Sequence, residues 1–247
     1  MPAAARSAVS PCRPRRTTLS RPFGALARRL RPGAWREGRA VLLALALCAA
    51  VPAWAGAQRE EALSANVASA MRRSVNDANA PRLVFDDARE GQAWLAEMSR
   101  RLEKRIPDAW MRQHLLTAIQ YEASRAGLDP QLVLGLIQVE SGFKKYAISG
   151  AGARGLMQVM PFWVRHIGNS EHNLFELTTN LRYGCTILRH YLDLERGNLF
   201  RALGRYNGSL GRPEYPNLVL GAWRAHWQWQ PPAALRTARL ESGATQD

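Results

Sequence analysis

The sequence of 247 residues predicts a mainly α-helical protein. Apolar residues recur at three- and four-residue intervals over several stretches, which is the spacing that places them on one face of a helix. Helix-start signals precede these stretches, the clearest being Asp129-Pro130. The sequence has no alternating apolar and polar pattern of useful length for a strand, and no internal repeat. We therefore expect a helical domain preceded by a helical N-terminal extension.

The first packed helix is expected after a flexible lead-in. Residues 58 to about 85 are polar and alanine-rich with little apolar periodicity. Over residues 86–105, Trp94, Leu95, Met98 and Leu102 recur at helical spacing with charges between them, and Pro107 follows. This pattern predicts an amphipathic helix that packs on the core from outside.

Two consecutive helices are expected in the middle of the chain. Asp108 opens a helical run, and Gly127 stands where a C-terminal cap is expected. Asp129 as the N-cap and Pro130 at the first helical position then start the next helix. Later helices are expected over residues 156–167, 173–195 and 198–206.

Residues 1–57 have the features of a secretory leader. They carry +9 of the net charge of +14 and run into AVLLALALCAAVPAWAGA, where small residues follow an apolar core. The apolar stretch is shorter than the roughly 20 residues that span a bilayer, so a permanent anchor is the less favoured reading. Leu47 before Cys48 argues against a lipoprotein. We expect a periplasmic or otherwise exported protein.

The remaining chain carries a net charge of only +5, so the total charge is no argument for a nucleic-acid partner.

Cys185 is the only cysteine after the leader, which excludes an intramolecular disulfide there. Its apolar neighbours predict a buried structural thiol. The five histidines lack metal-ligand spacings, and no phosphate-binding glycine loop is present. We expect neither a metal nor a cofactor.

Glu140 is an unusual residue in the helix predicted to begin at Pro130, because it is a charged residue on the apolar face of that helix. It follows Leu136 and Ile137 by four and three residues, which places its carboxyl on the face turned toward the core. Burial would raise its pKa toward the value that a general acid near neutral pH requires. A glutamate at a fraying helix end, with Gly142 letting it reach water, explains the local pattern equally well.

Four separated motifs decide between these readings. They are ESGF at residues 140–143, SGAGARGLMQ at 149–158, Asn180 with Gly184, and RYNG at 205–208. In order and spacing they resemble the signature of the soluble lytic transglycosylase (SLT) domain, glycoside hydrolase family 23. The similarity covers about residues 112–222. One such motif would carry little weight, whereas four in register are specific.

The resemblance implies a lysozyme-like helical catalytic domain with a groove for the glycan strands of peptidoglycan, in which Glu140 is the only catalytic carboxylate. Glu140 would protonate the glycosidic oxygen between N-acetylmuramic acid and N-acetylglucosamine. As a carboxylate it would then take the proton of the muramic C6 hydroxyl, which closes onto C1. The acetamido oxygen of the substrate would replace a second carboxylate. The product would be a 1,6-anhydro sugar.

The resemblance also implies a set of substrate-binding residues: Ser149, Met157, Gln158, Tyr206, Asn207 and Tyr215. Gln158 would donate to sugar polar groups, and Met157 would lie against a ring. Tyr206 and Asn207 resemble the pair beside the catalytic acid. The segment GSLGRPEYPNLV departs from the commoner family form, which puts the role of Tyr215 in doubt.

Two alternatives stay open. A goose-type lysozyme-like hydrolase would need a second acid as its base, and Asp193, Glu195 and Glu214 are available downstream. An inactive peptidoglycan-binding or secretion-scaffold module is the other, although the presence of Glu140 with Tyr206 argues against it.

The expected organisation has four parts and one main partner. Peptidoglycan glycan strands are the expected partner of a monomer, with cell-wall or secretion-machinery proteins left open. The parts are a leader (1–57), a flexible lead-in plus amphipathic helix (58–107), the catalytic domain (108–229) and a disordered tail (230–247).

Overall fold

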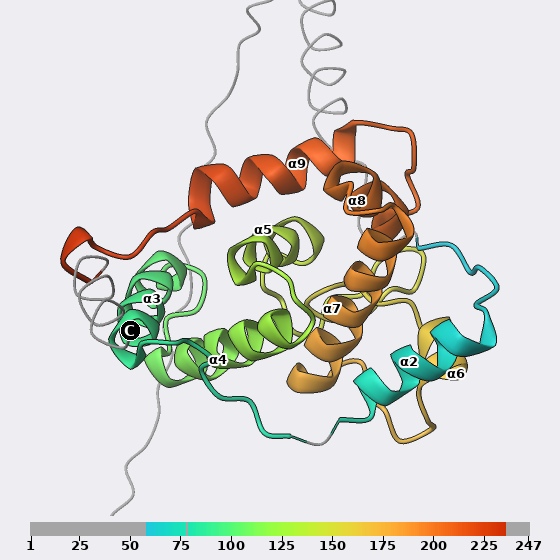
Figure 1. Ribbon diagram of the computed structural model, residues 1–247, viewed down its shortest axis with the longest axis horizontal. Helices are drawn as coiled ribbons and strands as arrows, with labels where there is room; N and C mark the ends of the chain where they lie inside the picture. The colour runs from blue at the N-terminus through green and yellow to red at the C-terminus, as the bar shows by residue number, and fades with distance from the viewer. Residues whose placement is uncertain (1–57, 78, 236–247) are drawn as a thin grey trace, which may run out of the picture. The chain divides into compact units, whose positions relative to one another are not determined.

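The structure is a computed structural model that describes residues 58–77 and 79–235. The expected leader and most of the expected tail, residues 236–247, lie outside the described residues. Within the described part the fold is mainly helical, as predicted (Figure 1). The helices are α2 (Ala65–Val75), α3 (Ala88–Leu102), α4 (Ala109–Arg125), α5 (Pro130–Glu140), α6 (Phe162–Ile167), α7 (Leu177–Leu194), α8 (Leu199–Asn207), α9 (Glu214–Ala222) and the π-helical turn η1 (Trp223–Trp227).

Helix α5 lies between α4 on one side and α9 on the other (Figure 1). All positions from Leu132 to Ile137 are buried, so its central turns contact protein all round. The crossing with α9 and η1 is close at Gly135, where an added Cβ would lie 2.9 Å from the backbone nitrogen of Trp223. On the other side of the molecule α7 packs against α2, α4 and α8.

The predicted helix starts are confirmed at Asp108 and Asp129, and the helix expected from residue 86 begins at Ala88 with Asp87 as its N-cap. The side chains of Asp87, Asp108 and Asp129 each accept a hydrogen bond from a backbone N–H in the first turn of α3, α4 and α5. Gly127 has a φ of +64°, as expected for a residue that ends a helix. Trp94, Met98 and Leu102 of α3 are buried, so the predicted amphipathic face is confirmed.

The prediction of a flexible lead-in from residue 58 to about 85 is wrong over residues 65–75. Helix α2 forms there, starting at the Ser64 N-cap, and it packs against α6 and α7. Its anchors Met71 and Val75 are separated by one turn and are the only fully buried positions of this helix. Two apolar anchors in an alanine-rich segment leave too weak a periodicity to identify from sequence.

Two further boundaries differ from the sequence prediction. The helix expected over residues 156–167 begins only at Phe162, because residues before it form isolated antiparallel bridges from Arg154 to Ile148 and to Val159. Helix α9 was not predicted, because its segment contains Pro213 and Pro216. Both prolines fall at the helix start, where a backbone N–H has no intrahelical partner to lose.

Candidate active site

Glu140 is the last residue of α5, and its carboxyl is buried, with 5% of the residue exposed. The fraying-end reading is therefore wrong. Loss of hydration disfavours the carboxylate and raises the pKa of Glu140 to about 8. Its Oε2 atom is buried and has no hydrogen-bond partner among the described residues. At neutral pH the site thus holds a protonated carboxyl with one oxygen uncommitted.

Tyr215 holds the other oxygen of this carboxyl. It lies in the first turn of α9, fully buried, and its hydroxyl donates a hydrogen bond of 2.5 Å to Oε1 of Glu140. This bond favours the charged form and opposes part of the effect of burial. The position that the sequence left in doubt is thus the one in contact with the candidate acid.

Tyr206, in α8, is also buried, but its hydroxyl donates to the backbone carbonyl of Met157 at 2.7 Å. The phenol that orients Glu140 is therefore that of Tyr215, whereas Tyr206 supports the neighbouring loop. Asn207 follows Tyr206 at the end of α8 and is also buried.

The loop over residues 148–159 is fixed by Asn180 of α7. The Asn180 amide accepts from the backbone nitrogen of Met157 at 2.8 Å and donates to the carbonyls of Arg154 and Leu174 at 2.9 and 2.8 Å. Gly155 makes room for this amide: its φ is +77°, and a Cβ there would lie 2.3 Å from Asn180. The glycine and asparagine motifs thus have a structural role in shaping the loop.

The predicted substrate contacts of this loop are placed differently. The Met157 side chain is fully buried against Gly184, so it does not face a groove. Gln158 is 1% exposed and donates its amide to the carbonyls of Ala147 and Gly155. Ser149 is half-buried, and its hydroxyl accepts from the backbone nitrogen of Ala153 at 3.1 Å. All three side chains brace the loop.

Gln58 is a neighbour of this site that the sequence did not reveal. Its buried amide donates to the carbonyl of Gln158 and accepts from the backbone nitrogen of Met160 and the indole N–H of Trp163. Farther along the same segment, Glu61 forms an ion pair with Arg205 of α8 at 3.3 Å. The start of the described chain therefore packs on the loop beside the candidate acid, and only the three-dimensional structure could show this.

The three carboxylates that could serve as the base of a hydrolase are either ion-paired or exposed to solvent. Asp193 pairs with Arg189, and Glu195 pairs with both Arg201 and Arg205. Glu214 is exposed at the start of α9. The contacts of Glu140 point to the Tyr215 phenol and to none of these carboxylates.

Cys185 is fully buried, as predicted, and burial raises the pKa of its thiol far above the ordinary range. Within residues 58–77 and 79–235 no group of three or more His, Cys, Asp and Glu side chains is placed to hold a metal ion. None of the helices in this same part has the length and hydropathy needed to cross a membrane.

Part of the chain matches known proteins in sequence. Residues 117–215 match the family described as Transglycosylase SLT domain. Over 93 residues the chain is 36% identical to the transglycosylase of Enterobacteria phage PRD1, covering 38% of this chain and 34% of that protein. Membrane-bound lytic murein transglycosylase C of Histophilus somni is 53% identical over 115 residues, covering 40% and 32%. Its counterpart from Haemophilus influenzae is 54% identical over 112 residues, covering 39% and 31%.

The chain spans about a third of the length of these curated relatives. Among solved structures, an inactive mutant of the lytic transglycosylase Slt from Pseudomonas aeruginosa covers 76% of this chain and 38% of its own. The sequence identity there is 18% and the TM-score 0.37, a level of similarity that carries no argument about function.

Proposed function

We propose that this chain, whose residues 117–215 match the Transglycosylase SLT domain family, is a peptidoglycan lytic transglycosylase with Glu140 as its single acid and base. The observation that carries the proposal is the buried Glu140 carboxyl, with one oxygen held by Tyr215 and the other without a partner among the described residues. A carboxyl in this state can donate a proton at neutral pH.

The reaction begins with proton transfer from Glu140 to the oxygen of the β-1,4 bond between N-acetylmuramic acid and N-acetylglucosamine. The C1–O bond breaks, and the N-acetylglucosamine part of the strand leaves with the proton on its O4. The acetamido oxygen of the muramic residue shares the positive charge that develops at C1. The second carboxylate of an ordinary glycosidase is then not needed.

The second step returns the proton to the enzyme. Glu140, now a carboxylate stabilised by the Tyr215 hydroxyl, takes the proton of the muramic C6 hydroxyl. The C6 oxygen forms a bond to C1, which gives the 1,6-anhydro end and regenerates the protonated acid. Because no water enters, the reaction is a lyase-type cleavage.

The hydrolase reading receives less support. A base that activates water must reach the sugar face opposite Glu140. Glu195 is committed to two arginines and Asp193 to a third, so each would first have to break an ion pair. The inactive-scaffold reading does not account for an oriented acid with its pKa raised to about 8.

Export of the chain belongs to the same proposal. Peptidoglycan lies outside the cytoplasm, and the basic, apolar and small-residue pattern of residues 1–57 is typical of a cleavable secretory signal. The relatives from Histophilus somni and Haemophilus influenzae are named as membrane-bound proteins. We propose a periplasmic enzyme that works as a monomer on glycan strands.

The proposal is tested by Glu140→Gln, which keeps the size of the side chain but removes the transferable proton. Release of soluble muropeptides from purified sacculi should fall by about 10²–10⁴-fold. Sedimentation with insoluble peptidoglycan should be retained. Glu103→Gln is the matched control at an exposed glutamate outside the site and should keep wild-type turnover. Turnover of Glu140→Gln within tenfold of wild type would rule out the proposed role.

A further inference from the structure

A segment without regular secondary structure, residues 58–63, precedes α2, and we refer to it as the strap. Its exposed acidic residues are tied to two helices of the fold. Glu60 forms an ion pair with Arg165 of α6 at 3.7 Å, and Glu61 forms one with Arg205 of α8 at 3.3 Å. The strap therefore joins α6 to α8.

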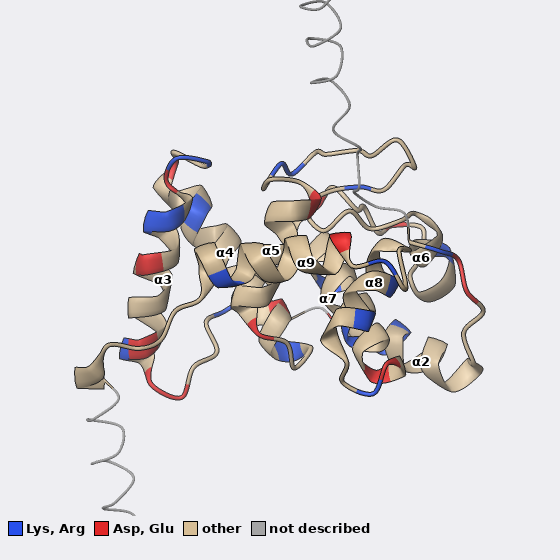
Figure 2. Cartoon of the chain, turned by 90° about the horizontal axis from the view of Figure 1, so that it is seen from above, with Lys and Arg blue, Asp and Glu red and all other residues tan. Residues whose placement is uncertain are grey.

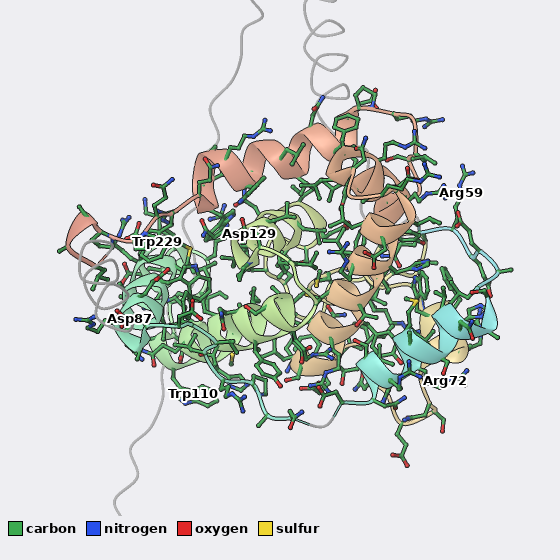
Figure 3. The ribbon with its side chains drawn as sticks, in the orientation of Figure 1. Arg59, Arg72, Asp87, Trp110, Asp129 and Trp229 are labelled. Atoms are coloured by element: carbon green, nitrogen blue, oxygen red, sulfur yellow. The ribbon has the colours of Figure 1, made fainter. Side chains whose placement is uncertain are left out.

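Gln58 is the only buried residue of the strap, with 4% of its surface exposed. The next residue, Arg59, is exposed, and Figure 3 shows its side chain pointing out from the molecule. A primary amide loses free energy when it is buried without hydrogen-bond partners. The burial of Gln58 therefore depends on the partners that its amide finds.

Both ends of the Gln58 amide bind the chain that leads from the loop over residues 148–159 into α6. The Oε1 atom accepts hydrogen bonds from the indole N–H of Trp163 at 2.9 Å and from the backbone nitrogen of Met160 at 3.2 Å. The Nε2 atom donates to the carbonyl of Gln158 at 3.3 Å. One side chain thus fixes the end of the loop at three points.

Tyr206 connects this end of the loop to the candidate acid. Its hydroxyl donates to the carbonyl of Met157 at 2.7 Å. Burial raises the pKa of Tyr206 well above its ordinary value; the Glu140 carboxyl adds to this rise, and the Gln58 amide opposes it. Tyr206 of α8 and Tyr215 of α9 are the two phenols that face the Glu140 carboxyl.

We propose that Gln58 is a positioning residue for Glu140, because its amide fixes the loop beside Tyr206 and so keeps water away from the buried carboxyl. Gln58 acts through the loop and the phenol rather than on the substrate. The inference rests on the proposed function in taking Glu140 as the acid. It extends the site to a residue outside the family match over residues 117–215.

The test follows the carboxyl carbon of Glu140 by NMR against pH, in the exported protein labelled with carbon-13 glutamate. The resonance is assigned by its absence in Glu140→Gln. Gln58→Ala leaves a polar space that water can fill. Because hydration favours the carboxylate, the pKa of Glu140 should fall from about 8 by at least about one unit. The alkaline limb of kcat/KM against pH should move down with it.

Gln120→Ala is the matched control, because Gln120 is also a buried glutamine that ties an irregular segment to a helix. Its amide accepts from the backbone nitrogen of Val84 at 2.8 Å and donates to the carbonyl of Val84 at 2.6 Å. Gln120→Ala should lower stability to a similar degree but change the pKa of Glu140 by less than about 0.3 units. Gln58→Met fills the space without the hydrogen bonds and should lower this pKa, as Gln58→Ala does.

Three results would overturn the inference. They are an unchanged pKa of Glu140 in Gln58→Ala, an equal fall in Gln120→Ala, and a wild-type pKa in Gln58→Met, which would assign the effect to volume rather than to hydrogen bonds. The titration needs no turnover. Hydrolysed products from the wild-type protein would therefore refute the proposed lytic mechanism and leave the result on Gln58 standing.

Discussion

Burial sets the chemistry of Glu140 at the scale of single residues. A glutamate with a pKa of about 8 holds its proton at pH 7, where an exposed glutamate would have lost it. Tyr215 moderates this effect because its hydroxyl stabilises the carboxylate that the second reaction step requires. The two residues together therefore serve both halves of the proposed cycle.

Tyr215→Phe should shift the alkaline limb of the pH–activity profile upward. Loss of the phenol removes a donor to the charged form, so the pKa of Glu140 rises further above about 8. The plateau rate should also fall, since the carboxyl loses its orientation. Measuring kcat/KM against pH checks this, with Tyr183→Phe as a buried phenol that bonds His172 instead. An alkaline limb that stays in place or moves to lower pH would contradict the assignment.

Because Glu140 is buried, its raised pKa makes the free energy of unfolding fall as the pH rises. The folded-state pKa of about 8 lies above the ordinary 4.5, so between these values the folded state binds more protons and the free energy of unfolding falls with increasing pH. Glu140→Gln does not titrate and should escape this loss. Its stability relative to wild type should rise from pH 5 to pH 8 by roughly 3 kcal/mol and change little below pH 4.5. Urea unfolding at several pH values measures the difference in unfolding free energy between Glu140→Gln and the wild-type protein. A difference that is the same at every pH would contradict the prediction.

The candidate acid could be identified from the sequence, but its partner could not. Helical spacing put Glu140 on the core-facing side of α5, and four motifs in register supported it. Tyr206 and Tyr215 both follow in the sequence, and their order does not reveal which phenol reaches across to α5. The crossing at Gly135 decides it, since it brings the start of α9 to the end of α5.

At the scale of elements, the starts of α4 and α5 were predictable because an aspartate cap is a local signal. Aspartate caps mark α3, α4 and α5 within one or two residues. Helix α9 begins with prolines and has no side-chain cap, so tertiary contacts with α5 and α8 determine it. The shape of the loop over residues 148–159 could not be predicted from the sequence either, because it depends on Asn180 in another element.

Asn180→Ala should destabilise the loop and the site together. The change leaves the Met157 nitrogen and the carbonyls of Arg154 and Leu174 without the Asn180 amide in a buried place. The free energy of unfolding should fall by roughly 2–4 kcal/mol, and kcat/KM should fall with it. Denaturant titration measures the first effect. Thr178→Ala, half-buried in the same helix, should cost less than about 1 kcal/mol, and equal losses would argue against the bracing role.

At the scale of the whole molecule, net charge distinguishes residues 1–57 from the rest of the chain. Most of the net charge of +14 belongs to residues 1–57, and Figure 2 shows basic and acidic segments interspersed over the described helices, with both along α3. The extension before the SLT match is not a mere linker, because α2 and Gln58 pack on the rest of the described fold. Such long-range packing leaves no periodic trace in the sequence, so it could not be predicted.

The most direct test of the central claim is mass spectrometry of the muropeptides released from purified sacculi by the wild-type protein. If C6 rather than water attacks C1, each product should be lighter than its hydrolysed counterpart by one water, about 18 Da. Its ends should also resist reduction by borohydride. Products at the hydrolysed mass, with reducible ends, would contradict the mechanism and direct the search for a second carboxylate to Asp193, Glu195 and Glu214.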